Sequence, residues 1–92
     1  MKIKICGLNP LRDVQLCIDL KINFLGFVFY KKSPRNINTS DIKILSTYKK
    51  NNASYVAVTV NPTDEFIEKN IIGNFDFIQL HGSGTNERIA EI

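Results

Sequence analysis

A thiol stands at the end of a short alternating run near the start of the chain, in Lys4-Ile5-Cys6-Gly7. Alternation along a strand puts Lys4 and Cys6 on one face, about 7 Å apart at roughly 3.3 Å per residue. A thiolate can accept a proton, and a nearby ammonium favours the thiolate over the thiol. A free cysteine is also commonly a small buried apolar residue. The pattern alone leaves Cys6 open between a packing role and a general base.

Polar side chains also follow the other apolar runs. Arg35 lies in a basic loop stiffened by the proline before it, where a guanidinium can hold a carboxylate or phosphate through two parallel hydrogen bonds. His81 comes two residues after Gln79, so both belong to one face of a strand, and an imidazole exchanges protons near neutral pH. Asn61 follows the third run. Each also has a structural reading, as part of a solvated basic loop or as a turn residue.

The composition argues against several kinds of site. Two cysteines, one histidine and no CxxC pair give too few soft ligands for zinc, so we expect neither a metal nor a cofactor. The net charge of +3 comes from dispersed lysines, which favours a solvated surface or a small anionic substrate over nucleic acid. No apolar run approaches the roughly 20 residues of a membrane helix, and the first residues lack the apolar region of a secretory signal. We therefore expect a cytoplasmic protein without a membrane partner.

Four short runs have strand-like character: Lys2–Cys6, Phe24–Phe29, Tyr55–Val60 and Phe75–Leu80. The segments between them are too long for hairpin turns and carry helix-start signals at Asn9-Pro10, Asn38-Thr39-Ser40 and Asn61-Pro62-Thr63. Thr85 or Asn86 is a candidate cap for a fourth helix. The order predicts one α/β domain over residues 1–92, with parallel strands joined by right-handed crossovers.

Parallel strands bring their carboxyl ends to one edge of the sheet, which is where ligand sites form in alternating β/α units. Cys6, Asn61, Gln79 and His81 all fall at such ends. If Lys4 and Cys6 face this site, the isoleucines between them face the helices. A four-stranded parallel sheet has two unpaired edges and incomplete cover, and the last helix has barely begun at residue 92. We therefore expect a piece of a larger fold.

The motifs taken together resemble the phosphoribosylanthranilate isomerase family of tryptophan biosynthesis. The matching pieces, in the family's order over essentially the whole chain, are Lys4-Ile5-Cys6-Gly7-Leu8, Asp13, Gly26-Phe27-Val28-Phe29, Ser33-Pro34-Arg35, Val58-Thr59-Val60-Asn61 and Gln79-Leu80-His81-Gly82. The resemblance implies a (β/α)8 TIM barrel, of which this chain covers about four β/α units. A complete barrel needs about 200 residues or more.

The resemblance also implies a reaction, the Amadori rearrangement of N-(5-phosphoribosyl)anthranilate to 1-(2-carboxyphenylamino)-1-deoxyribulose 5-phosphate. Cys6 is then the general base that removes the C2′ proton, and Arg35 holds the anthranilate carboxylate of the phosphosugar substrate. The remaining candidates for substrate binding are Lys4, Asn61, Gln79 and His81. The family's general-acid aspartate and its phosphate-binding loops belong to the second half of the barrel, which this chain lacks.

Three readings remain open at this point. The chain is the amino-terminal half of such an isomerase, inactive alone and in need of a complementing carboxyl-terminal half. It is part of another sugar-phosphate isomerase or epimerase on a related barrel. Or it is a non-enzymatic half-barrel that self-associates as a homo-oligomer to bury its edges.

Overall fold

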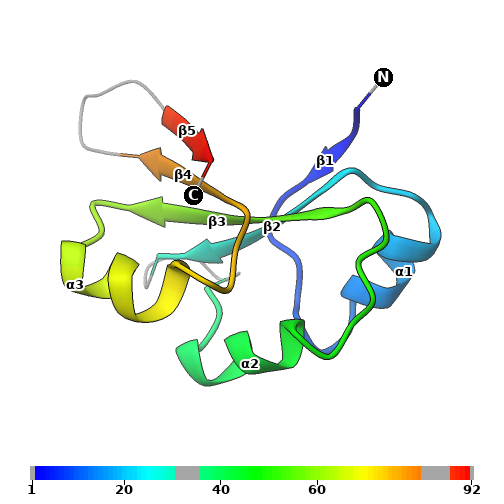
Figure 1. Ribbon diagram of the computed structural model, residues 1–92, viewed down its shortest axis with the longest axis horizontal. Helices are drawn as coiled ribbons and strands as arrows, with labels where there is room; N and C mark the ends of the chain where they lie inside the picture. The colour runs from blue at the N-terminus through cyan, green and yellow to red at the C-terminus, as the bar shows by residue number, and fades with distance from the viewer. Residues whose placement is uncertain (1, 31–35, 82–87, 92) are drawn as a thin grey trace.

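The computed structural model describes residues 2–30, 36–81 and 88–91, of which His81 and residues 88–91 are described by their backbone alone. The elements form a single sheet in the order β1-β2-β3-β4-β5 (Figure 1). The strands are β1 (Lys4–Ile5), β2 (Phe24–Phe29), β3 (Ser54–Val60), β4 (Phe77–His81) and β5 (Arg88–Glu91). The helical elements are α1 (Val14–Asp19), η1 (Thr39–Asp41), α2 (Ile42–Leu45), α3 (Asp64–Phe66) and the π-helical turn η2 (Ile67–Ile71).

The first four strands are parallel and joined by helical crossovers, as the sequence predicts. Figure 1 shows α1, α2 and α3 on the same side of the sheet, which leaves the opposite face without a helix layer among the described residues. This arrangement is half of a (β/α)8 barrel, in which helices cover the outer face and the other face lines the interior. The outer face and the concave inner face are named accordingly below.

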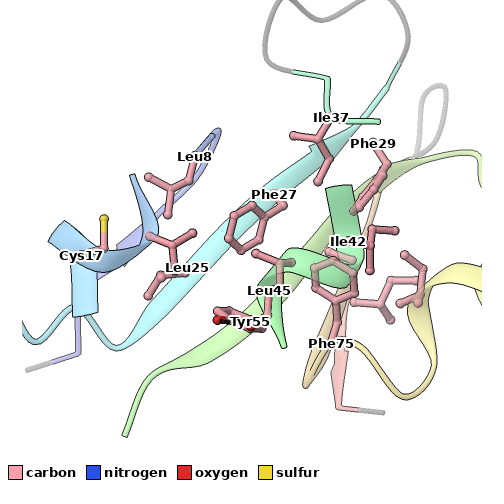
Figure 2. Packing of buried hydrophobic residues seen from close by; sticks show 14 of the residues in the cluster. Leu8, Cys17, Leu25, Phe27, Phe29, Ile37, Ile42, Leu45, Tyr55 and Phe75 are labelled. Carbon is pink, nitrogen blue, oxygen red and sulfur yellow. Dashed lines mark hydrogen bonds between the residues drawn. The ribbon is translucent and has the colours of Figure 1, made fainter. Parts of the chain in front are cut away.

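The core lies between the outer face of the sheet and the helices (Figure 2). Leu25, Phe27 and Phe29 alternate along β2 and are buried, which places the intervening residues on the inner face. Phe27 meets the ring of Tyr55 edge-on at 5.6 Å between centroids. Such edge-to-face pairs add about 0.5–1.5 kcal/mol beyond the burial of the rings. The outer face is therefore committed to packing.

Tyr55 joins β3 to both a helix and the next strand. Its hydroxyl donates to the carbonyl of Leu45 at 2.9 Å, and its main-chain N–H donates to Oδ2 of Asp76 at 2.8 Å. The same carboxylate oxygen accepts from Nζ of Lys50 at 2.7 Å. Burial, followed by the nearby Tyr48 and Asp76, raises the pKa of Tyr55 to about 12.

Helix-start signals in the sequence were right in place but not always in detail. Thr63 caps α3, where its Oγ1 accepts from the N–H of Phe66 at 3.1 Å. Asn9 instead closes a turn: its Oδ1 accepts from the N–H of Leu11 at 2.8 Å. The helix itself begins only at Val14. No described helix is long and apolar enough to cross a membrane.

Two expectations about the ends of the sheet are wrong. The segment after Thr85 and Asn86 does not form a fourth helix over 88–91; it is β5, antiparallel to β4. Pairing with β4 supplies main-chain hydrogen bonds along that strand edge, which outweighs a weak helix signal. Ile3 and Ile5 are 48% and 37% exposed and are not packed under a helix. α1 buries Val14, Cys17 and Ile18 within the main core, so it does not cover β1.

Candidate functional site

Cys6 directly follows β1 and lies against Gly26 of β2. A Cβ placed on Gly26 would be 3.0 Å from Sγ and 3.1 Å from Cα of Cys6, so no side chain separates the two residues. The chain then turns at Gly7, with φ at +79°, and the N–H of Leu8 donates to the carbonyl of Gly26 at 3.1 Å. Gly26 belongs to the inner face of β2, and Cys6 is exposed. The thiol is therefore accessible at the carboxyl end of the first strand.

Lys4 and Gln79 meet across the same inner face. The Lys4 ammonium donates to the side-chain Oε1 of Gln79, from the first parallel strand to the fourth. Gln79 is 5% exposed, and its main-chain carbonyl also accepts from Oγ1 of Thr59 at 3.1 Å. A cation is thus fixed on the inner face, on the strand that also carries Cys6.

Asn61 lies at the end of β3 with φ at +44°, a left-handed conformation that asparagine tolerates. It lines a depression of about 630 Å³ whose walls include Phe29, Phe66 and Ile37. These three side chains belong to the outer face and the core margin. Cys6, Lys4 and Gln79 do not line this depression, so Asn61 is grouped with a different surface.

Two further candidates cannot be placed. Arg35 lies outside the described residues, as does the loop that carries it. His81 is the last residue of β4 and pairs with Val60, but its side chain lies outside the described part of the structure. The structure therefore brings together Cys6, Lys4 and Gln79.

Metal chemistry finds no support in the described part of the chain, where no three residues among His, Cys, Asp and Glu gather to hold an ion. The second cysteine, Cys17, is 5% exposed on α1. Burial, and secondarily the charge of Asp13, raises the pKa of the Cys17 thiol. Cys17 is a core residue, as the sequence predicts.

The sequence gave no role to Gly26 beyond its place in a motif. The available signal was a single glycine inside Phe24-Leu25-Gly26-Phe27-Val28-Phe29, a strand otherwise made of bulky apolar residues. A glycine in such a strand marks a close approach of another backbone. The approaching segment, Cys6, could not be identified from that signal.

The fold and the position of the thiol define the class: a half of a parallel β/α barrel with polar groups on its inner face. A model of the family described as N-(5'phosphoribosyl)anthranilate (PRA) isomerase matches residues 3–92. The chain belongs to the PRA isomerase family.

Individual relatives agree. The N-(5'-phosphoribosyl)anthranilate isomerase of Rhizobium meliloti is 37% identical over 99% of this chain, and that of Maridesulfovibrio salexigens is 38% identical over 97%. Phosphoribosyl anthranilate isomerase from Thermotoga maritima superposes with a TM-score of 0.80 at 31% identity. A structure of phosphoribosyl anthranilate isomerase in complex with reduced 1-(o-carboxyphenylamino)-1-deoxyribulose 5-phosphate gives a TM-score of 0.81 at 31% identity.

Coverage is unequal between the chain and these relatives. The two solved structures match 92% of this chain but only 42% and 44% of their own lengths. The Rhizobium meliloti protein is covered over 43% of its length and the Maridesulfovibrio salexigens protein over 42%. The chain thus spans less than half of the length of the relatives it matches.

Proposed function

We propose that this chain supplies the amino-terminal half of a phosphoribosylanthranilate isomerase, with Cys6 as its general base. The observation that supports this most directly is the exposed thiol at the carboxyl end of β1, since catalytic groups of β/α barrels come from the carboxyl ends of their strands. The family match over residues 3–92 supports the choice of reaction. The substrate is N-(5-phosphoribosyl)anthranilate.

The reaction divides into two proton transfers. An acid protonates the ring oxygen of the ribose, the C1′–O bond breaks, and the nitrogen lone pair forms a protonated Schiff base at C1′. The Cys6 thiolate then removes the C2′ proton, and the electron pair of that bond moves toward C1′ and neutralises the iminium. Tautomerisation of the resulting enol to a C2′ ketone gives the aminoketose. Atoms balance without an external oxidant or cofactor.

The other predicted residues bind the substrate in this proposal. Arg35 holds the anthranilate carboxylate by two parallel hydrogen bonds. Lys4 and Gln79, which meet on the inner face, form the part of the pocket next to Cys6. His81 and Asn61 complete the carboxyl-end rim. The ring-opening acid and the phosphate-binding groups come from the complementing half.

The isolated chain is therefore expected to be inactive or nearly so. A positioned general acid or base contributes about 10²–10⁴ in rate, and in this proposal the acid lies on another segment. Addition of a carboxyl-terminal half should restore turnover if it supplies that acid and closes the sheet.

The test is a complementation assay. The chain is mixed with the separately expressed carboxyl-terminal half of the Rhizobium meliloti relative, and product is followed by chromatography. We expect activity only in the mixture, and its loss on Cys6→Ser with substrate binding retained. Cys17→Ser is the matched control, since Cys17 is buried away from the site. Full turnover by the chain alone, or by the Cys6→Ser mixture, would refute the assignment.

A second candidate, self-association as a non-enzymatic half-barrel, rests on a different observation. β1 pairs with a neighbour on one side only, and Ile3 and Ile5 beside that open edge are exposed. Burying such an edge against a second copy removes both liabilities. Sedimentation velocity at micromolar concentration tests this reading, and a monomer throughout would exclude it.

A further inference from the structure

We infer that Gly26 is a positioning residue for the Cys6 thiol: the space left by its missing side chain sets where the sulfur lies on the inner face. The catalytic consequence rests on the proposed function. The positional claim rests only on the geometry of β1 and β2.

The contact involves backbone as well as side chain. A Cβ on Gly26 would be 3.0 Å from Sγ, 3.1 Å from Cα and 3.3 Å from Cβ of Cys6. The sulfur alone could rotate away, but the Cα cannot move without moving the strand. Any larger residue at position 26 must therefore displace the main chain that carries the thiol.

The hydrogen bonding around this contact limits how the displacement can occur. β1 is paired with β2 through Lys4 with Phe24 and Ile5 with Leu25, immediately before Cys6. Immediately after it, the N–H of Leu8 donates to the carbonyl of Gly26 itself. Cys6 is thus fixed from both sides over Gly26. A side chain there must stretch one of these attachments or push the thiol toward solvent.

The position of Gly26 in its own strand argues against a purely local role. Gly26 pairs with Val56 of β3 and lies between Leu25 and Phe27, which are fully buried on the outer face. Glycine is depleted in strands, because it packs nothing and loses the most conformational freedom on folding. Its presence is explained by what lies over it on the inner face, and that is Cys6.

The first test is the rate at which iodoacetamide alkylates Cys6 in the folded chain, read by mass spectrometry. We expect Gly26→Ala to change this rate by about fivefold or more, because access to the thiolate controls alkylation. Val28→Ala, on the same face of β2, is the matched control and should leave the rate within about twofold. Equal Cys6 rates in wild type and Gly26→Ala would overturn the inference.

The second measurement is a double-mutant cycle on the urea midpoint. Cys6→Gly removes the Sγ and Cβ that a new side chain would strike, so Gly26→Ala should lower the midpoint less in that background than in wild type. If Gly26→Ala alone does not fold, recovery of folding by the added Cys6→Gly change supports the inference. Equal midpoint losses in the two backgrounds, or no recovery, count against it.

The catalytic consequence is measured in the complemented enzyme. Displacement of a reacting group by about 1 Å can cost about a hundredfold in rate, so Gly26→Ala should lower kcat while KM changes little. A Gly26→Ala mixture with wild-type kcat would remove the catalytic part of the inference. If the wild-type mixture is inactive, the proposed function fails, whereas the alkylation rates and the cycle still decide the positional claim.

Discussion

Lys4 of β1 donates a hydrogen bond to the side chain of Gln79 of β4, although the two strands are separated by β2 and β3. The contact spans the inner face and links the beginning of the parallel sheet to its end. It holds a cation over the surface on which the proposed reaction takes place. Its two partners are separated by 75 residues in sequence, so the contact forms only in the folded sheet.

Loss of this contact should reduce stability in a coupled manner. Lys4→Met and Gln79→Met each keep most of the side-chain volume, and each is expected to lower the free energy of unfolding by about 1–2 kcal/mol. The double variant should lose less than the sum, with a coupling energy of about 1 kcal/mol, measured by urea denaturation. Strict additivity would show that the contact contributes nothing to the folded chain.

The two thiols should differ in reactivity. Cys6 is exposed, whereas Cys17 is 5% exposed and burial raises the pKa of its thiol. Thiolate is the reactive form, so iodoacetamide at neutral pH should label Cys6 first and Cys17 only on unfolding. Peptide mapping distinguishes the sites, with Cys17→Ala as the control for assignment. Parallel labelling of both cysteines in the native chain would contradict this structure of α1.

Two helical or near-helical leucines offer a matched test of the core. Leu45 is 1% exposed at the end of α2, whereas Leu16 on α1 is 61% exposed. Leu45→Ala is expected to cost about 2–5 kcal/mol in the free energy of unfolding, because it opens a cavity. Leu16→Ala should stay within about 0.5 kcal/mol of wild type. Comparable losses in the two variants would mean that the helices pack differently.

Tyr55 should make the chain sensitive to alkali. Its pKa is raised to about 12 from an ordinary value of 10.0, so the unfolded state loses the proton first as the pH rises. The stability tied to the neutral phenol is complete below pH 10 and is lost between about pH 10 and 12, amounting to roughly 2–3 kcal/mol. Urea midpoints measured across this range by circular dichroism test the sign.

Tyr55→Phe is the control for that experiment. The variant lacks the hydrogen bond to Leu45 and should be less stable near neutral pH, but its midpoint should fall less steeply between pH 10 and 12. Tyr30, which is 38% exposed, provides the comparison at the surface, and Tyr30→Phe should keep the wild-type profile. A Tyr55→Phe profile parallel to wild type would assign the alkaline loss to other groups.

The central strands were predictable because their sequence patterns are strong. Phe24–Phe29 is observed with the predicted bounds, and β3 begins one residue before the predicted Tyr55. The first strand shrinks to Lys4–Ile5, since it lies at an edge and only these residues pair. Element ends depend on such pairing partners, which periodicity does not reveal.

The candidate site was predictable in composition but not in grouping. The rule that carboxyl ends of parallel strands share one edge correctly drew attention to Cys6 and Gln79. That rule does not say which side chains touch. The Lys4–Gln79 hydrogen bond and the contact of Cys6 with Gly26 depend on sheet curvature and on the turn at Gly7, which are tertiary properties.

The antiparallel strand β5 bears on how this chain can join a longer sheet. It occupies the side of β4 not taken by β3, through the pairs from Phe77 with Glu91 to Leu80 with Arg88. An all-parallel barrel continues past its fourth strand through a parallel neighbour on that same side. A newcomer can bond there only by strand exchange, in which residues 88–91 give up their ladder as the replacement forms its own. Assembly therefore carries a kinetic barrier that β1, with no second neighbour, does not impose.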